Sequence, residues 1–193
     1  MLTAAAAEKV YRALDMPAQL DIALKVAGGA HLAWLPQETI LFNGAKVSRR
    51  IDLDLADGAS LLLCEAVVFG RTAMGERMRH GSFVDRWRLR HGGRLVFAET
   101  VRLEGDVGAK LARPAIADGA AAVATALIVP GDHALVERIR DISDGLGGEV
   151  GLSAWNGFAM ARFCAKDAAR LRADIVAVLS LASVLPLPRL FLN

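Results

Sequence analysis

Turn dipeptides divide much of this chain into short segments, and their spacing constrains the fold more than any other feature. Between them, apolar and polar residues alternate: Ile51, Leu53 and Leu55 are separated by Asp52 and Asp54. A period of two is typical of a half-buried strand. The dipeptides favour tight turns between such strands. They are Gly28-Gly29, Asn43-Gly44, Asp57-Gly58, Gly92-Gly93 and Asn156-Gly157. Residues 18–103 are therefore predicted to form a succession of β-strands.

The clearest predicted hairpin surrounds Gly92-Gly93. If the loop has two residues, Arg86 lies opposite Glu99 and Trp87 points to the core. Arg86 and Arg88 then point away from the core. A solvated sheet face is the simpler interpretation, and a docking surface for an acidic protein is the functional alternative. Nucleic-acid binding is not favoured, because aromatic residues are not interleaved with these arginines.

The last third of the chain has helical spacing instead. Asp132 precedes apolar residues three and four positions apart and is the expected N-cap of one helix. A second helix is predicted from Asp167, with Pro186 and Pro188 ending it. The predicted fold class is therefore mainly β, with two α-helices in the C-terminal third, in a single domain of residues 1–193.

Composition excludes several classes of protein. With 54% hydrophobic and 23% charged residues, the chain is not intrinsically disordered. Its net charge of +2 gives no reason to expect nucleic acid or an anionic membrane as a partner. No apolar run approaches the roughly 20 residues of a membrane-spanning helix. The two cysteines, Cys64 and Cys164, stand alone in apolar runs, which favours a reducing, cytoplasmic location.

An enzyme is one alternative to a binding protein. Glu76 and His80 are four residues apart, and with His91 they could supply ligands to a metal-dependent hydrolase. The surrounding segment is rich in glycine and basic residues, which suits an exposed turn better than a metal site. No nucleophile motif of the GxSxG type occurs in the chain.

Two short segments contain unusual combinations of residues. In one, Trp34, Pro36, Gln37 and Glu38 lie between two apolar runs. Pro36 fixes its own φ and favours an extended Leu35, which predicts a rigid bend. Trp34 is expected to anchor the bend in the core. Gln37 and Glu38 either satisfy loop backbone groups or contact a partner.

The other segment, "FGRTAMGE", follows a predicted buried strand. It places Gly70, Arg71, Gly75 and Glu76 in a turn flanked by glycines. A scaffold turn is the simpler interpretation, and a partner contact is the alternative.

Four motifs together resemble a known family. They are "EKVYRA" at 8–13, "WLPQETILF" at 34–42, "FGRTAMGE" at 69–76 and "LPRLFLN" at 187–193. Their order and separation resemble the urease accessory protein D family, called H in some bacteria, over essentially the whole chain. The resemblance implies an elongated fold of stacked, β-helix-like sheets with two helices. It also implies a non-enzymatic urease maturation factor.

The resemblance implies partners and cargo as well. Proteins of this family bind apo-urease and join the accessory proteins F and G, of which G is a GTPase. Nickel is then cargo delivered to urease, with no tightly bound cofactor in this chain, and passage near Glu76 is one hypothesis for its route. Family members usually continue upstream of "EKVYRA". We therefore expect an N-terminally truncated chain with unpaired strand edges, and a non-functional fragment is a further alternative.

Overall fold

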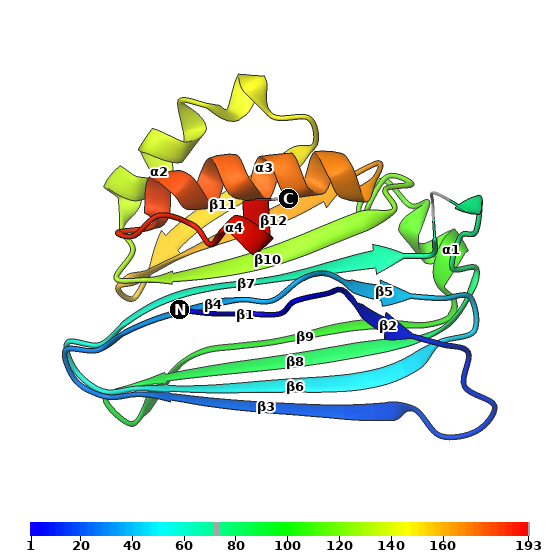
Figure 1. Cartoon of the computed structure of the whole chain (residues 1–193), viewed down its shortest axis with the longest axis horizontal. Helices are drawn as coiled ribbons and strands as arrows, with labels where there is room; N and C mark the ends of the chain where they lie inside the picture. Colours follow the sequence, from blue (N-terminus) through cyan, green and yellow to red (C-terminus); the bar gives the residue numbers. More distant parts are fainter. Residues whose placement is uncertain (72–73, 193) are drawn as a thin grey trace.

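The protein has three layers in this computed structural model, which describes residues 1–71 and 74–192. A four-stranded sheet packs against an eight-stranded sheet, and helices cover the outer face of the larger one (Figure 1). One apolar core lies between the helices and the larger sheet, and two further clusters lie between the sheets. The larger sheet is therefore the central layer.

The smaller sheet contains β3 (Ala18–Val26), β6 (Lys46–Leu55), β8 (His80–His91) and β9 (Arg94–Asp106), in that order. The first three strands are parallel, and β9 runs antiparallel to β8. Strand alternation places the apolar residues of β6 inward, as its sequence predicts.

The larger sheet is built around β7 (Ser60–Phe69). β10 (Ala122–Val129), β12 (Phe158–Ala165) and β11 (Glu149–Trp155) follow on one side. On the other side β7 pairs with β4 (His31–Leu35) and β5 (Thr39–Leu41), which pair in turn with β1 (Leu2–Thr3) and β2 (Glu8–Val10). Because both faces of β7 are covered, nearly every one of its residues is buried, which explains its continuous apolar run.

Both predicted helices are confirmed. Asp132 caps α2 (His133–Arg140) and Asp167 caps α3 (Ala168–Ala182), each accepting a backbone hydrogen bond from the first turn. The prolines after α3 precede a further short helix, α4 (Arg189–Leu192). The described residues also contain the short helices α1 (Val107–Leu111) and η2 (Ser143–Gly145), which were not predicted. No helix among the described residues is long and apolar enough to cross a membrane.

The mainly β class is confirmed, but β-helix-like stacking is not. From β3 to β8 the chain moves repeatedly between the two sheets, which produces the parallel pairs. Neither sheet closes or curls. The later strands form antiparallel pairs: β9 with β8, β10 with β12, and β11 with β12. Asn43-Gly44 and Asp57-Gly58 accordingly connect strands of different sheets, so hairpins at these two turns were wrongly predicted.

The hairpin at Gly92-Gly93 forms, and its expected register holds next to the turn, where His91 faces Arg94 and Arg90 faces Leu95. Farther from the turn the expected register is wrong. An irregularity between Leu89 and Arg90 shifts the pairing by one residue. Arg86 therefore stands opposite Thr100, and Glu99 stands opposite Trp87. A one-residue shift moves a side chain to the other face of the sheet, so Glu99 points inward.

Candidate functional site

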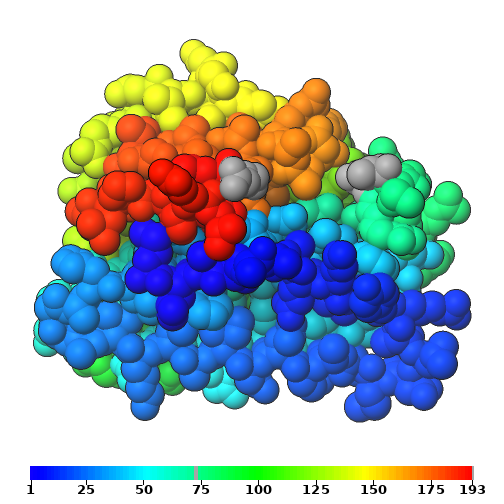
Figure 2. Space-filling model, viewed as in Figure 1, coloured from blue at the N-terminus to red at the C-terminus, as the bar shows by residue number. Residues whose placement is uncertain are grey.

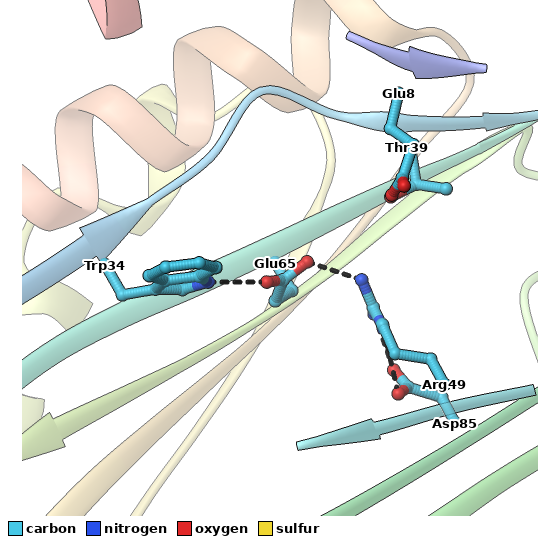
Figure 3. Close-up of polar contacts among 6 residues, drawn as sticks. All are labelled: Glu8, Trp34, Thr39, Arg49, Glu65 and Asp85. Atoms are coloured by element: carbon cyan, nitrogen blue, oxygen red, sulfur yellow. Dashed lines mark hydrogen bonds and ion pairs between the residues drawn. The ribbon is translucent and has the colours of Figure 1, made fainter. Parts of the chain in front are cut away.

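Three charged side chains meet between the two sheets. Arg49 on β6, Glu65 on β7 and Asp85 on β8 are only 3%, 4% and 6% exposed. The Arg49 guanidinium donates to both Asp85 oxygens, from Nε to Oδ1 at 3.0 Å and from Nη2 to Oδ2 at 2.6 Å. Its Nη1 donates to Glu65 Oε2 (Figure 3). One guanidinium thus joins the sheets and compensates two carboxylates, leaving one negative charge when all three are ionised.

The bend predicted at Pro36 lies beside this cluster. β4 pairs with β7 as far as Trp34, and β5 resumes the pairing at Thr39. The strand edge is therefore interrupted alongside Glu65. Trp34 Nε1 donates to Glu65 Oε1 at 2.7 Å, across the gap (Figure 3). The bend replaces backbone pairing with one side-chain donor, and Trp34 also packs against the core between the sheets.

The buried groups alter one another's proton affinity. Burial raises the pKa of Glu65, although Arg49 and the Trp34 N–H act in the opposite direction. Burial by itself would lower the pKa of Arg49, but the carboxylates of Glu65 and Asp85 outweigh it and raise that pKa. Arg49 is therefore a permanent cation, whereas the charge of Glu65 depends on its surroundings.

A cavity of about 310 Å³ adjoins the cluster. Four carboxylates and two guanidinium groups line it, which gives this charged lining a net charge of −2 when all are ionised. They belong to Arg49, Glu65, Asp85, Glu99, Glu149 and Arg162. Arg162 Nη2 on β12 donates to Glu99 Oε2 on β9 at 2.8 Å, joining the two sheets again. Because the Arg162 side chain is 53% exposed, this second ion pair lies at the surface end of the cavity.

The other side of the bend contacts the C-terminal helices. Arg172 Nη2 on α3 donates to Gln37 Oε1 at 2.7 Å and to Glu38 Oε2 at 2.5 Å. Gln37 Nε2 donates to the backbone oxygen of Leu190 at 2.6 Å. The Arg172 guanidinium lies 4.7 Å from the ring centre of Phe191. Figure 2 shows the red C-terminal residues beside the blue N-terminal segment. These contacts favour a structural role for Gln37 and Glu38.

The "FGRTAMGE" turn is joined to the loop between β5 and β6. Arg71 donates to Glu76, and Glu76 Oε1 accepts the backbone N–H of Asn43 at 3.0 Å. These two hydrogen bonds, chiefly that of Arg71, lower the pKa of Glu76. The Arg71 guanidinium also lies 4.6 Å from the ring centre of Phe42. The charged side chains of the turn therefore have internal partners too.

Glycine is required within this turn. Gly70 has a φ of +99°, and a Cβ there would lie 2.4 Å from the backbone oxygen of Glu76. Gly75 has a φ of +71°, in the left-handed region that favours glycine. Thr72 and Ala73 of the same motif lie outside the described residues.

Arg86 and Arg88 lie on the outer face of the four-stranded sheet. Arg86 Nη1 donates to Ser48 Oγ at 3.1 Å. Arg88 is exposed and stands opposite Asp52 of β6, which forms an ion pair with Arg50. The face therefore mixes charges of both signs.

The candidate metal ligands are not brought together. Glu76 lies in the loop before β8 and not on a helix. The spacing of four residues therefore does not put Glu76 and His80 on one face of a helix. His80 and His91 are the first and last residues of β8. At about 3.3 Å per residue they are roughly 35 Å apart. Among the described residues, no group of three or more His, Cys, Asp or Glu side chains could hold a metal ion.

Comparison with known proteins decides the family. The profile described as "UreD urease accessory protein" matches residues 1–190. This chain belongs to the UreD family.

Several relatives support this membership. The chain is 76% identical to "Urease accessory protein UreD 3" of Bradyrhizobium sp. (strain BTAi1 / ATCC BAA-1182). It is 72% identical to "Urease accessory protein UreD 1" of Bradyrhizobium sp. (strain ORS 278) and to "Urease accessory protein UreD" of Rhodopseudomonas palustris (strain BisB18). Each alignment covers 100% of this chain and 69% of the relative.

UreD membership corrects the enzymatic alternative. UreD proteins are non-enzymatic factors of urease maturation. The hydrolase suggested for Glu76, His80 and His91 was therefore wrong, because it relied on a helical spacing that a loop and a long strand do not provide.

Sequence reasoning missed the buried cluster, although a signal was present. Arg49 lies in the same period-two row as the inward residues Val47 and Ile51, and Asp85 lies between Phe83 and Trp87 in the same way. A charge within an apolar row is expected to have a buried partner. Arg172 gave no comparable signal, because its partners lie 134 and 135 residues away.

Proposed function

We propose that this chain is a scaffold in urease maturation that contacts apo-urease and the accessory proteins F and G and supports nickel insertion. UreD membership supports the maturation role. The named partners, the cytoplasmic location and the single domain are part of the same hypothesis. Nickel is cargo in this scheme and not a resident cofactor.

The observation that supports the nickel role is the acidic lining of the cavity between the sheets. Its charged groups have an excess of carboxylates, and one of them, Glu65, is buried with a raised pKa. A cation that enters this space favours the ionised form of Glu65 and offsets the excess charge. Carboxylate oxygens are suitable transient ligands for a divalent metal. The cavity therefore fits the passage of a cation better than that of an anion.

The outer arginine face supplies a second element of the scheme, a contact for an acidic surface of a partner. Arg88 is exposed there, and Arg86 and Arg90 lie on the same face of β8. Exposed charges of this kind change association rate and salt dependence more than affinity. The bend at Gln37 and the turn at Arg71 are assigned structural roles, because their side chains form hydrogen bonds within this chain.

Two measurements in one experiment test this function. The chain is co-expressed with a urease operon that lacks its own D protein, and urease subunits and F protein retained on the tagged chain are measured. Urease nickel content and activity are measured in the same cells. We expect retention of both partners and nickel-dependent activation. Loss of both partners with a soluble chain would contradict the scaffold role and favour the non-functional fragment.

A matched pair of variants separates nickel passage from docking. Glu99→Gln removes a carboxylate at the surface end of the cavity, and Glu104→Gln removes an exposed carboxylate of the same strand. If cations pass through the cavity, only Glu99→Gln lowers the nickel content of urease while both variants retain the partners. Equal nickel content in the two variants would contradict this route.

A further inference from the structure

A row of residues crosses the inner face of the central sheet, from the buried charged cluster toward the edge of the sheet. Strand register sets these residues side by side on β7, β10, β12 and β11, and each lines the cavity: Glu65, Thr125, Arg162 and Gly151. Directly paired residues point to the same face of a sheet. Glu65 is buried, Thr125 is half-buried and Arg162 is exposed. The row is therefore a path from the cluster to the surface, with Arg162 near its outer end.

The Arg162 side chain spans the space between the sheets at this point. Its Nη2 donates to Glu99 Oε2 at 2.8 Å, and Glu99 belongs to the opposite sheet. A second hollow, open to the surface, has Phe97, Trp155 and Met160 in its lining together with the same Glu99 and Arg162. The ion pair is thus a shared wall that separates the inner cavity from the outer hollow.

A second carboxylate is within reach of the same guanidinium. Glu149 on β11 stands opposite Cys164 on β12, so it is a diagonal neighbour of Arg162 on the same face of the sheet. Diagonal neighbours are close enough for a long side chain to make contact. Glu149 is exposed and also lines the cavity. Arg162 therefore has one carboxylate to pair with in the opposite sheet and another in its own sheet.

The residue beside Arg162 on β11 is a glycine. Gly151 stands directly opposite Arg162, and apart from its chain neighbours a Cβ added there would meet no atom of the described residues within 4 Å. Its φ lies outside the left-handed region, so the backbone does not require glycine. Glycine within a strand often marks a site where another group approaches closely. The open space over Gly151 lets the Arg162 side chain lie across β11 toward Glu149.

We infer that Arg162 is the gate of the cavity between the sheets. Paired with Glu99, it closes the path to the buried cluster, and turned across Gly151 to Glu149, it opens that path. Each position gives the guanidinium a carboxylate partner, so the exchange loses no ion pair. Exposed ion pairs contribute little to stability, so neither position holds the side chain permanently. The gate follows from this geometry, whereas its control of nickel passage rests on the proposed function.

Alkylation of a cysteine behind the gate tests its opening. Thr125→Cys places a thiol directly behind Arg162, and Cys164→Ser removes the native thiol that lines the cavity. In this reporter chain the rate of reaction with N-ethylmaleimide is measured against pH. Its limit for the thiolate form reports access independently of the thiol pKa. Cys64, which is 1% exposed and packs on the helix side of the sheet, gives the background rate in the Cys164→Ser chain.

Loss of the closed position should speed this reaction. Arg162→Gln and Glu99→Gln should each raise the limiting rate of the reporter chain several-fold. Arg102→Gln is the matched control and should leave the rate unchanged, because Arg102 is also about half exposed and pairs with Glu104 on its own strand. Unchanged rates in both gate variants overturn the inference. An equal rise in the reaction of Cys64 would indicate general loosening of the sheets and also overturns it.

Loss of the open position should have the opposite effect. Glu149→Gln removes the carboxylate of that position, and Gly151→Val fills the space across β11 without backbone strain. Each should lower the limiting rate several-fold in the reporter chain, and neither should do so once Arg162→Gln is present. If Gly151→Val slows the reaction equally in the Arg162→Gln chain, the valine only shields the thiol, and the inference is overturned.

Urease nickel content tests the consequence for cation passage separately. In the co-expression system Arg162→Gln opens the path and makes its lining more acidic, so nickel should enter urease faster than with Arg102→Gln. Glu99→Gln does not separate these effects, because it removes a carboxylate together with the closed position. Faster alkylation without faster nickel entry would contradict the nickel route and leave the gate in place. Unchanged alkylation would overturn the gate at any nickel content.

Discussion

The indole Nε1 of Trp34 lies 2.7 Å from Glu65 Oε1, although strand pairing between their two strands stops at Trp34 itself. A bend in the backbone and a buried carboxylate are thus one structural unit. Without Trp34, Glu65 would have Arg49 as its hydrogen-bond donor at Oε2 but no donor at Oε1. A buried acceptor without a donor is costly.

Replacing Trp34 by phenylalanine should destabilise the fold. The variant keeps an aromatic ring but leaves Glu65 Oε1 without its donor, which should cost about 1–3 kcal/mol of unfolding free energy. Urea denaturation measures the change. Trp155→Phe is the control, because it makes the same change of side chain at a tryptophan that is 37% exposed. Equal losses in the two variants would contradict a role for the indole N–H.

Replacing Arg49 by methionine should be more damaging. The change leaves Glu65 and Asp85 buried without their common cation, and the loss of one partner from a buried ion pair costs about 3–5 kcal/mol. Thermal and urea unfolding measure it. Arg50→Met is the control, because Arg50 is 54% exposed and pairs with Asp52 at the surface. We expect a loss of about 0–1 kcal/mol there. Similar losses in both variants would show that the buried cluster does not stabilise the fold.

Glu65 and Glu76 should affect the pH dependence of stability with opposite sign. Because the pKa of Glu65 is raised on folding, the folded state binds its proton more strongly, and stability falls as pH increases from the ordinary value through the raised one. Glu65→Gln should remove this decline. Because the pKa of Glu76 is lowered, its contribution is present above its ordinary pKa and is lost as pH falls through the lowered value. Glu76→Gln should remove that acid-side loss.

Unfolding free energy measured against pH for the native chain and both variants distinguishes these effects. Parallel native and Glu65→Gln curves on the alkaline side of the ordinary glutamate pKa would show that the Glu65 pKa is not raised. The Glu76→Gln curve serves as the reference for a carboxyl group with the opposite shift.

Replacing Arg172 by lysine should loosen the corner formed by the bend and α4. Lysine keeps the charge but lacks the planar guanidinium that reaches Gln37, Glu38 and Phe191 together. We expect faster amide hydrogen exchange in residues 189–192 and in the bend, with little change in the strands of the central sheet. Arg170→Lys is the control, since the Arg170 side chain is 58% exposed and forms its ion pair locally, with Asp167 at the start of the same helix. Unchanged exchange in Arg172→Lys would contradict the role of this side chain.

Local pattern predicted much of the secondary structure. Alternation in β6 placed Ile51, Leu53 and Leu55 inward, and N-caps with apolar spacing located α2 and α3. These features depend on residues close in sequence, so a single sequence shows them. Strand partners are different, because the Asn43-Gly44 turn suits a hairpin and a connection between sheets equally well.

The sequence by itself determined the mainly β class, the helix starts and the rigid bend at Pro36, since each follows from backbone geometry and nearest neighbours. Its motifs also indicated the family. Only the tertiary structure decided that Arg49, Glu65 and Asp85 share one buried cluster, that Glu99 points inward to Arg162, and that Arg172 joins the bend to the C-terminus. A buried charge requires an opposite charge or a hydrogen-bond partner. Burial depends on how the sheets pack together, so no local segment of the sequence shows which groups pair.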